Sequence, residues 1–257
     1  MAETPLDYGN WIQKKNLLVL GLSTLGMGAL IFVPVGAIYR LIVAILFIIM
    51  LISTLLPLYA YALFSQSGGR FQEKIYRLII QRLGPAGQGS ILDIGSGNGV
   101  LAVNLAQENT EAQVIGIDYW GKDWEYSKAV CEQNARAASV ADRVHFQKGD
   151  AAALGFATAA FDGAISNLTF HEVKSVANKR EVLREALRVL KPGGSFAFVD
   201  YFYDAKYYGK AADFDAYLKE LKLSRVECKS LAEIMPLPFL LRHPRILGLV
   251  GIIYGRK

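Results

Sequence analysis

The hydrophobic positions of this chain follow two patterns, and the first is a pair of long uncharged segments near the N-terminus. Residues 16–39 and 41–69 contain no Asp, Glu, Lys or Arg, and Arg40 alone separates them. A helix needs about 20 apolar residues to cross a bilayer, so each segment is long enough. Pro34 and Gly36 favour a break between the two. The predicted element is a two-helix transmembrane hairpin (residues 1–66, with spans over about 16–35 and 40–63).

Other interpretations of these segments fit the sequence less well. A signal peptide has an apolar core of about 7–15 residues and a small-residue cleavage site, whereas these segments are longer and doubled. A buried hydrophobic hairpin, or one span followed by an interfacial segment, stays open. Lys14 and Lys15 precede the first segment, and Arg70, Lys74 and Arg77 follow the second. The positive-inside rule then predicts a multi-pass cell-membrane protein whose termini and second domain face the cytoplasm.

Beyond residue 70 the second pattern begins, in which short apolar runs alternate with stretches of helical periodicity. Strands are expected at residues 90–94, 112–119, 143–150, 161–168, 195–202, 225–230 and 247–255. Helices are expected at residues 71–83, 100–109, 122–138, 178–190 and 214–222, with Trp124 among the apolar positions of the third and Lys191-Pro192-Gly193-Gly194 ending the fourth. Residues 67–257 should therefore form an α/β domain, with a doubly wound, Rossmann-like, mostly parallel sheet and an antiparallel C-terminal hairpin.

Composition narrows the class of partner. The formal net charge of +5 is mildly basic, which suits an anionic membrane surface but is too small to indicate nucleic-acid binding. Cys131 and Cys228 form no CxxC pair and are expected to be reduced thiols. The three histidines are scattered, so no metal site is expected, and nothing in the sequence specifies an oligomeric state.

A glycine-rich turn follows the first predicted strand of this domain. The stretch ILDIGSGNG places Gly95, Gly97 and Gly99 directly behind Asp93, with Ser96 and Asn98 between the glycines. Glycines at this place permit a sharp turn and let a ligand approach the backbone closely. Doubly wound sheets bind ligands beyond the carboxyl ends of their strands. The spacing GxGxG differs from the GxGxxG of nicotinamide sites and disfavours an oxidoreductase.

Polar residues also end the next three predicted strands. Asp118 ends the second strand and can accept both hydroxyls of a ribose, because a carboxylate offers two acceptor oxygens. Asp150 ends the third strand, at a place that suits hydrogen bonds to an adenine edge, and Asn167 ends the fourth. Tyr119, Trp120, Gly149, Ala151 and Leu168 flank these three residues and complete the candidate cofactor-binding set.

With these elements in order, the chain resembles the class I S-adenosylmethionine-dependent methyltransferases. The matching segments, within residues 70–202, are LDIGSGNG, VIGIDYW, KGDAAAL, FDGAISNLTFHEV and LRVLKPGGSFAFVD. The resemblance implies S-adenosylmethionine as cofactor. It also implies that Asp93 and the three glycines hold the methionine half, that Asp118 binds the ribose with Tyr119 beside the adenine, that Asp150 and Ala151 frame the adenine, and that Asn167 lies near the sulfonium.

His171 is the candidate general base, because it follows the strand that should face the methyl group, and Glu172 is a lesser candidate. A cap or a hydrogen-bonding role at the pocket wall is the alternative for His171. Amino methyltransferases of nucleic acids carry an Asn/Asp-Pro-Pro-aromatic signature where this chain has Asn167-Leu168-Thr169-Phe170. The missing prolines argue against a nucleic-acid acceptor.

The acceptor is inferred from the anchor. Two membrane helices would raise the effective concentration of the enzyme near an apolar substrate such as a lipid or quinone. The apolar, proline-broken segment 235–245 and the tyrosines that follow Asp200 either form a lid over such a substrate or only cover the core. A methyltransferase of a membrane protein partner and a non-catalytic cofactor-binding module remain as alternatives.

Overall fold

The computed structural model describes residues 6–34, 36–121 and 125–257. The described chain packs as two compact units, one formed by residues 10–73 and one by the residues before Asn10 together with 74–257. Each unit has its own internal packing and is described by itself. Trp124, predicted in a helix, lies outside the described residues.

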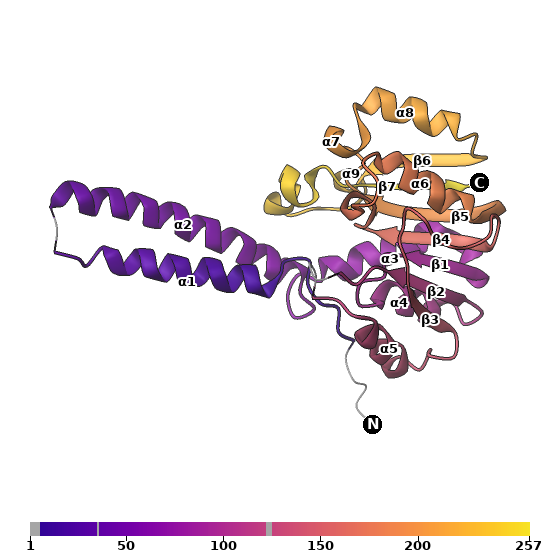
Figure 1. Cartoon of the computed structure of the whole chain (residues 1–257), viewed down its shortest axis with the longest axis horizontal. Coiled ribbons are helices and arrows are strands. Elements are labelled where there is room, and N and C mark those ends of the chain that lie inside the picture. The colour runs from indigo at the N-terminus through magenta and orange to yellow at the C-terminus, as the bar shows by residue number, and fades with distance from the viewer. Residues whose placement is uncertain (1–5, 35, 122–124) are drawn as a thin grey trace. The chain divides into compact units, whose positions relative to one another are not determined.

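The smaller unit contains two antiparallel helices, α1 (Lys14–Leu30) and α2 (Ala37–Phe64) (Figure 1). Midway along them the hydroxyls of Thr24 and Thr54 share a hydrogen bond of 2.8 Å, and each hydroxyl also lies 2.9 Å from a backbone carbonyl of its own helix. Gly28 lets the ring of Phe47 approach, since a Cβ there would lie 3.0 Å from that ring. Small and hydroxyl-bearing residues at a helix contact are typical of helix pairs in membranes.

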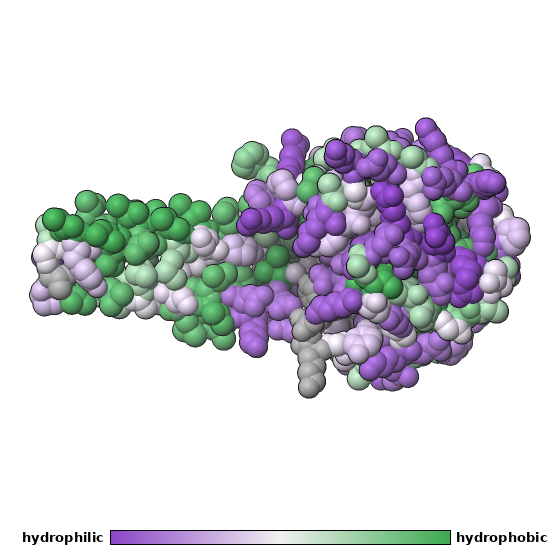
Figure 2. Space-filling view, turned by 45° about the horizontal axis from the view of Figure 1, so that its top comes forward, coloured by the Kyte–Doolittle hydropathy of each residue, from purple (hydrophilic) through white to green (hydrophobic). Residues whose placement is uncertain are grey.

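The face of these helices that Figure 2 shows is mostly apolar, as its green atoms indicate. Among the described residues, α2 is the helix that is long and apolar enough to cross a bilayer; the mean hydropathy of its most apolar window is 2.9, and 6% of that window is buried. Helix α1 has 17 residues and ends at Leu30, short of the expected 35, and Arg40 lies inside α2 and not in the turn. The two helices are present, and their expected crossing of a membrane stays a prediction.

Seven strands of the described chain form one sheet in the order β3-β2-β1-β4-β5-β7-β6 (Figure 1). The strands are β1 (Ser90–Ile94), β2 (Gln113–Asp118), β3 (Val144–Lys148), β4 (Phe161–Asn167), β5 (Leu190–Asp200), β6 (Arg225–Ser230) and β7 (Gly251–Arg256). Strands β1 to β5 are parallel, and β7 runs antiparallel between β5 and β6. The predicted doubly wound, mostly parallel sheet with an antiparallel C-terminal pair is confirmed.

Helices cover both faces of this sheet. They are α3 (Phe71–Leu83), α4 (Val100–Glu108), α5 (Lys128–Ala137), α6 (Lys179–Arg188), α7 (Ala205–Tyr208), α8 (Ala211–Glu220) and α9 (Leu231–Ile234), with short turns η1 (Gly84–Gln88), η2 (Phe170–Glu172), η3 (Phe239–Arg242) and η4 (Pro244–Gly248). Strand β1 is buried on both faces and supplies Ile91, Leu92 and Ile94 to the core. This double burial explains why the parallel strands are nearly continuous apolar runs.

Three of the element boundaries that differ from the prediction are explained by specific contacts. Helix α5 begins after Ser127, whose hydroxyl accepts from the amide of Val130, and is shorter than the expected 122–138. The Lys191–Gly194 stretch does not terminate a helix: α6 already ends at Arg188, and Leu190 pairs with Phe161 at the start of β5. Strand β7 begins only at Gly251, because Pro244–Gly248 coils into a helical turn.

The parallel register brings the carboxyl ends of β1 to β5 to one edge of the sheet. Strand order reverses between β1 and β4, which is the position where open α/β sheets bind their ligands. The loops that begin at Gly95, Tyr119, Gly149, Leu168 and Tyr201 therefore share this edge.

Candidate active site

The glycine loop after β1 is a sharp bend of positive φ angles. Gly95, Gly97 and Gly99 have φ values of 78°, 56° and 76°, a region that favours glycine. The amides of Gly95 and Ser96 both donate to the carbonyl of Ile117, which fastens the bend to β2. A Cβ on Gly95 would lie 2.0 Å from Oγ1 of Thr169. The loops after β1 and β4 thus meet directly at Gly95, a contact that the sequence did not reveal.

Asp93 lies at the base of this bend with its side chain out of solvent. Its exposed fraction is 1%, and neither carboxylate oxygen has a hydrogen-bond partner within the described residues. The hydroxyl of Ser96 donates to the backbone carbonyl of Asp93, and the Ser96 hydroxyl and the Ala102 amide only partly offset the effect of burial on the pKa of the carboxyl. Burial, and secondarily the charge of Asp118, raises the pKa of the Asp93 carboxyl to about 7. Burying a carboxylate without a partner is energetically unfavourable, and a cationic ligand would compensate it.

Asp118, at the end of β2, holds the glycine loop from the other side. Its Oδ2 accepts from the amide of Gly97 at 2.8 Å, and its Oδ1 accepts from the amide of Trp120 at the same distance. Each carboxylate oxygen has two acceptor positions, so capacity remains for a further donor. Burial raises the pKa of the Asp118 carboxyl. The residue expected to bind a ribose therefore also shapes the loop beneath it.

The two aromatic residues after Asp118 separate in direction. Trp120 turns back over the glycine loop, with a φ of 44° and its indole N–H donating to the carbonyl of Gly97 at 2.9 Å. Tyr119 is 65% exposed, and the ammonium of Lys148 lies 4.8 Å from its ring centroid. Tyr119 thus remains available to an adenine at the rim, while Trp120 belongs to the loop itself.

The third strand end is occupied by a compact turn. The amide of Gly149 donates to the carbonyl of Asp118, which keeps this turn beside β2. Oδ1 of Asp150 accepts from the amide of Ala152 at 2.9 Å. Ala151 is buried and packs in the core cluster. Asp150 and Ala151 thus first serve the local turn, and their expected framing of an adenine stays a prediction.

At the end of β4, Asn167 presents a second unpaired acceptor. Its side-chain oxygen is buried without a hydrogen-bond partner among the described residues, and the same holds for the side-chain oxygen of Asn98 in the glycine loop. Leu168 adopts a φ of 52°, and its amide donates to the carbonyl of Val199, which turns the chain sharply after Asn167. This turn aims the loop back toward Gly95.

The unpaired atoms permit a test of whether the site fits the expected cofactor. S-adenosylmethionine carries an ammonium, a sulfonium, two ribose hydroxyls and an adenine amino group. The buried atoms left without partners around the bend are all acceptors, on Asp93, Asn98 and Asn167. Acceptors complement the cationic and donor groups of this cofactor, whereas a pyrophosphate would need donors. The residues therefore fit S-adenosylmethionine.

Sequence reasoning missed Asp200, which ends β5 and holds His171. Asp200 is 1% exposed, and its Oδ1 lies 2.9 Å from Nδ1 of the His171 ring. The backbone amides of His171 and Tyr201 also donate to its carboxylate. The rings of Tyr201 and Tyr207 lie 4.7 and 5.5 Å from the His171 ring by centroid. The sequence could have pointed to this residue, because Asp200 is a further acidic residue near the carboxyl end of a predicted parallel strand.

This partner changes the acid–base character of His171. Burial disfavours the charged imidazole, but the charge and hydrogen bond of Asp200, with Glu172 3.4 Å from Nε2, outweigh it. The pKa of His171 is raised to about 9. The ring is thus oriented as a general base would be, yet it is protonated at neutral pH in this arrangement.

A second feature missed by sequence reasoning is the docking of residues 6–9 on the glycine loop. The buried side chain of Asn134 accepts from the amide of Asp7 at 2.8 Å and donates to the carbonyl of Asp7 at 3.0 Å. The side-chain nitrogen of Asn134 also donates to the backbone carbonyl of Asn98. The side-chain nitrogen of Asn98 in turn donates to the carbonyl of Asp7. Gly9 lies against Tyr126, since a Cβ there would be 2.8 Å from that ring. Asn134 therefore joins the N-terminal segment to the glycine loop.

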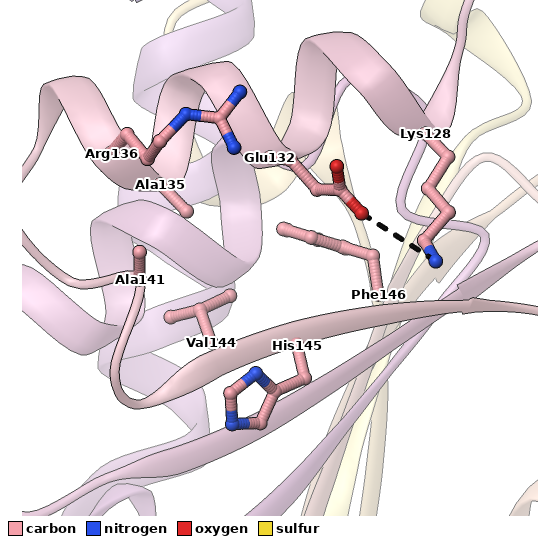
Figure 3. A pocket seen from close by; sticks show the side chains of 8 residues that line it. All are labelled: Lys128, Glu132, Ala135, Arg136, Ala141, Val144, His145 and Phe146. Carbon is pink, nitrogen blue, oxygen red and sulfur yellow. Dashed lines mark ion pairs between the residues drawn. The ribbon is translucent and has the colours of Figure 1, made fainter.

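A surface pocket of about 330 Å³ lies elsewhere, between α5 and the edge strand β3. Figure 3 shows Lys128 and Glu132 directed toward each other across its rim, with His145 on the strand below. None of the predicted site residues lines it. The pocket is separate from the strand ends at which the site residues gather.

Comparison with known proteins agrees with this geometry. The methyltransferase domain family matches residues 87–233, more than half of the chain. The O-methyltransferase rstn1 of Aspergillus nomiae is 32% identical over 133 residues, covering 52% of this chain and 56% of that protein. The ubiquinone/menaquinone biosynthesis C-methyltransferase UbiE of Geotalea daltonii is 29% identical over 126 residues, covering 49% and 51%. The chain spans about half the length of these curated relatives.

The fold is also found among solved structures. The cyclase SpnF superposes with a TM-score of 0.52 at 22% identity, covering 72% of this chain and 80% of that one. A likeness at this identity concerns the fold alone, and the glycine bend with its unpaired acceptors supplies the chemical match. This chain belongs to the methyltransferase domain family, whose cofactor is S-adenosylmethionine.

Proposed function

We propose that this chain is a membrane-anchored methyltransferase that moves a methyl group from S-adenosylmethionine to a small apolar acceptor, such as a lipid or quinone. The observation that carries the proposal is the buried, unpaired carboxylate of Asp93 at the point where the strand order reverses. A protein keeps such a group where a ligand cation compensates it. The proposed membrane anchor is supported by the exposed apolar surface of α2.

Three residues of this chain would hold the cofactor in the proposed site. Asp93 would accept from the ammonium of the methionine half, and Asp118 from the ribose hydroxyls. The side-chain oxygen of Asn167 would face the sulfonium. The bound cofactor supplies a methyl group on a positively charged sulfur, and the protein supplies orientation and a dry environment.

His171 would manage the proton of a hydroxyl acceptor. The bound cofactor would supply the methyl group, and the hydroxyl proton of the acceptor would pass to Nε2 of His171. Asp200, 2.9 Å from Nδ1, would keep that nitrogen protonated and hold the ring in place. Because the pKa of His171 is raised to about 9, the neutral ring that this role requires becomes more abundant as the pH rises toward that value.

Two observations support a small apolar acceptor. Tyr201 and Tyr207 flank His171 with aromatic faces and edges, an environment that suits an apolar ring or chain. The two curated relatives are named for O-methylation and for methylation in ubiquinone and menaquinone biosynthesis. A membrane anchor would raise the local concentration of an enzyme whose substrate dissolves in the bilayer.

The membrane arrangement follows from α2 and its partner. An α-helix rises about 1.5 Å per residue, so α1 is about 26 Å long against about 30 Å of hydrocarbon. We therefore propose that α2 spans the bilayer and that the shorter α1 enters it antiparallel to α2. Lys14, Lys15, Arg70 and Lys74 would then lie on the cytoplasmic side. The protein would then be a cell-membrane protein with its catalytic domain in the cytoplasm.

A methyltransferase of a membrane protein and a cofactor-binding module without turnover are the competing functions. The cyclase SpnF shows by its name that this fold also carries other chemistry. A turnover assay that separates product classes distinguishes all three.

The test uses the full chain in lipid nanodiscs, S-adenosylmethionine labelled in its methyl group, and extracted membrane lipids as acceptors. We expect label in the organic phase, and loss of that label with Asp93→Asn but not with Asp213→Asn, a matched exposed acid on α8. Label confined to protein or RNA would reject a small apolar acceptor, and no turnover at all would reject the enzyme.

A further inference from the structure

The segment 235–245, between β6 and β7, emerges at the same edge of the sheet as the candidate site. Ser230 at the end of β6 and Gly251 at the start of β7 are register partners, and Gly251 also pairs with Asp200. The chain between them forms the turns that begin at Phe239 and Pro244 (Figure 1). We refer to residues 235–245 as the edge loop.

The apolar residues of the edge loop divide into two groups. Leu237 and Leu241 are buried, as is Leu247 just beyond, so these leucines cover the core. Phe239 points the other way and is 94% exposed. Among the described residues of the larger unit, the other two large apolar residues that are exposed are tyrosines, which carry a hydroxyl. Phe239 is therefore a fully apolar ring held in solvent.

Basic residues follow Phe239 closely along the chain, and Arg242 and Arg245 are positively charged. Arg242, His243 and Arg245 all lie at the surface, and the sequence contains no Asp or Glu after Glu233. Within the described chain neither Arg242 nor Arg245 forms an ion pair. The loop is also braced, since Nε of Arg242 donates to the carbonyl of Leu237 and the amide of Arg245 donates to the His243 ring. A firm backbone thus presents one ring and a cluster of positive charge.

The residue that directly follows the edge loop, Ile246, is linked to the candidate base. The hydroxyl of Tyr201 donates to the carbonyl of Ile246 at 2.8 Å, and the Tyr201 ring packs on His171. The chain directly after the edge loop is therefore connected through Tyr201 to the residue that would receive the acceptor proton.

We propose that the edge loop docks on an anionic lipid surface, with Phe239 inserted among the acyl chains and Arg242 and Arg245 against lipid phosphates. A stable protein interface buries about 800 Å² on each partner, far more than one ring and its neighbours offer. An apolar wedge flanked by cations is instead the composition that binds the headgroup boundary. The inference shares with the proposed function its membrane location, but not its chemistry.

The test measures membrane depth at position 239 in the full chain. Cys228→Ser provides the background, and Cys131 is buried and hidden from reagents. Phe239→Cys, or Gln133→Cys as an exposed control on α5 beside β3, then carries a nitroxide in nanodiscs of phosphatidylcholine and phosphatidylglycerol. We expect the label at 239 to be relaxed by oxygen and shielded from a water-soluble nickel chelate, roughly threefold more than the label at 133.

A second arm tests the charges. Arg242→Gln with Arg245→Gln, or a nanodisc of phosphatidylcholine alone, should return nickel access at 239 toward the control, because each arginine contributes about a fivefold factor near an anionic surface. Equal nickel access at 239 and 133 in the anionic nanodisc would overturn the inference and would favour a protein partner. The measurement does not involve turnover, so a failure of methyl transfer is seen separately.

Discussion

Two strand ends of this sheet carry a buried aspartate, and the two are treated in opposite ways. Asp93, near the end of β1, has no hydrogen-bond partner within the described residues. Asp200, the last residue of β5, accepts from the ring of His171 and from two backbone amides. Both side chains are 1% exposed. Burial is therefore the same at the two sites, and pairing is the difference.

The difference indicates what each half of the edge does. A paired buried charge holds its partner in place and remains complete without a ligand. An unpaired one stays unfavourable until a ligand arrives, and its pKa of about 7 reflects that. In the proposed function, the β1 side would bind the cofactor and the β5 side would position His171. The loop after β1 meets the loop that carries His171 where Gly95 contacts Thr169.

The largest effect is expected at that meeting point. Gly95→Ala would place a Cβ 2.0 Å from Oγ1 and 2.6 Å from Cβ of Thr169, so no rotamer of Thr169 relieves the clash. With the strain of a positive φ, we expect the free energy of unfolding to fall by about 4 kcal/mol in urea titrations. Gly97→Ala is the control: its nearest atom lies at 3.6 Å, and about 1 kcal/mol is expected. Equal losses of unfolding free energy in the two variants would show that the contact between Gly95 and Thr169 is not what makes Gly95→Ala destabilising.

Next in size is the loss of the unpaired charge. Asp93→Asn should weaken S-adenosylmethionine binding by about 100-fold, or about 2.7 kcal/mol, in calorimetry. Because the wild-type carboxyl has a pKa of about 7, binding should be roughly tenfold tighter at pH 8 than at pH 6, and the variant should lose this dependence. A pH-dependent Asn variant would assign the proton to another group.

The same residue makes a stability prediction of defined sign. Its folded pKa lies above the unfolded value, so between about pH 4 and 7 the folded protein holds the extra proton. The contribution of Asp93 to the free energy of unfolding therefore falls as the pH rises through this window. Without cofactor, Asp93→Asn should be the more stable protein at pH 8, and a less stable variant would contradict an unpaired carboxylate.

A smaller effect is expected on the positioning side. For a hydroxyl acceptor, kcat should rise with pH toward about 9 as His171 loses its proton. Asp200→Asn removes the charge that raises this pKa, so the rising limb should move toward lower pH while kcat at the plateau falls about tenfold. Cofactor affinity should not change. If the pH range over which kcat rises is the same in Asp200→Asn as in the wild type, His171 is not the group that titrates.

The smallest effect concerns the N-terminal segment on the binding side. Asn134→Ala removes the hydrogen bonds to Asp7 and to the carbonyl of Asn98 and should lower the free energy of unfolding by about 1 kcal/mol. Cofactor affinity should fall about threefold, since Asn98 belongs to the glycine loop. Asn104→Ala, which loses one bond to the Tyr8 hydroxyl, is the control and should leave affinity unchanged. Equal affinities would separate the segment from the site.

Local patterns were sufficient for most of the fold. Strand β1 and helix α3 match their predicted ranges, because an apolar run bounded by Gly and a helix of clear periodicity depend on neighbours in sequence. The Lys191–Gly194 stretch was misassigned because local chemistry favours a turn, whereas pairing of Leu190 with Phe161 extends the strand. For the site, the acids and amides at the strand ends were found, but their partners were not.

What the sequence by itself determined is the order of strands and helices, the glycine bend after Asp93, and the polar residue at each strand end, because periodicity and turn chemistry act over a few neighbouring residues. Only the tertiary structure decided that Asp93 remains unpaired, that Asp200 forms a hydrogen bond with His171, and that Asn134 forms hydrogen bonds with the backbone of Asp7. Those contacts join residues separated by 29 and 127 positions, and the packing of the whole sheet sets their distances.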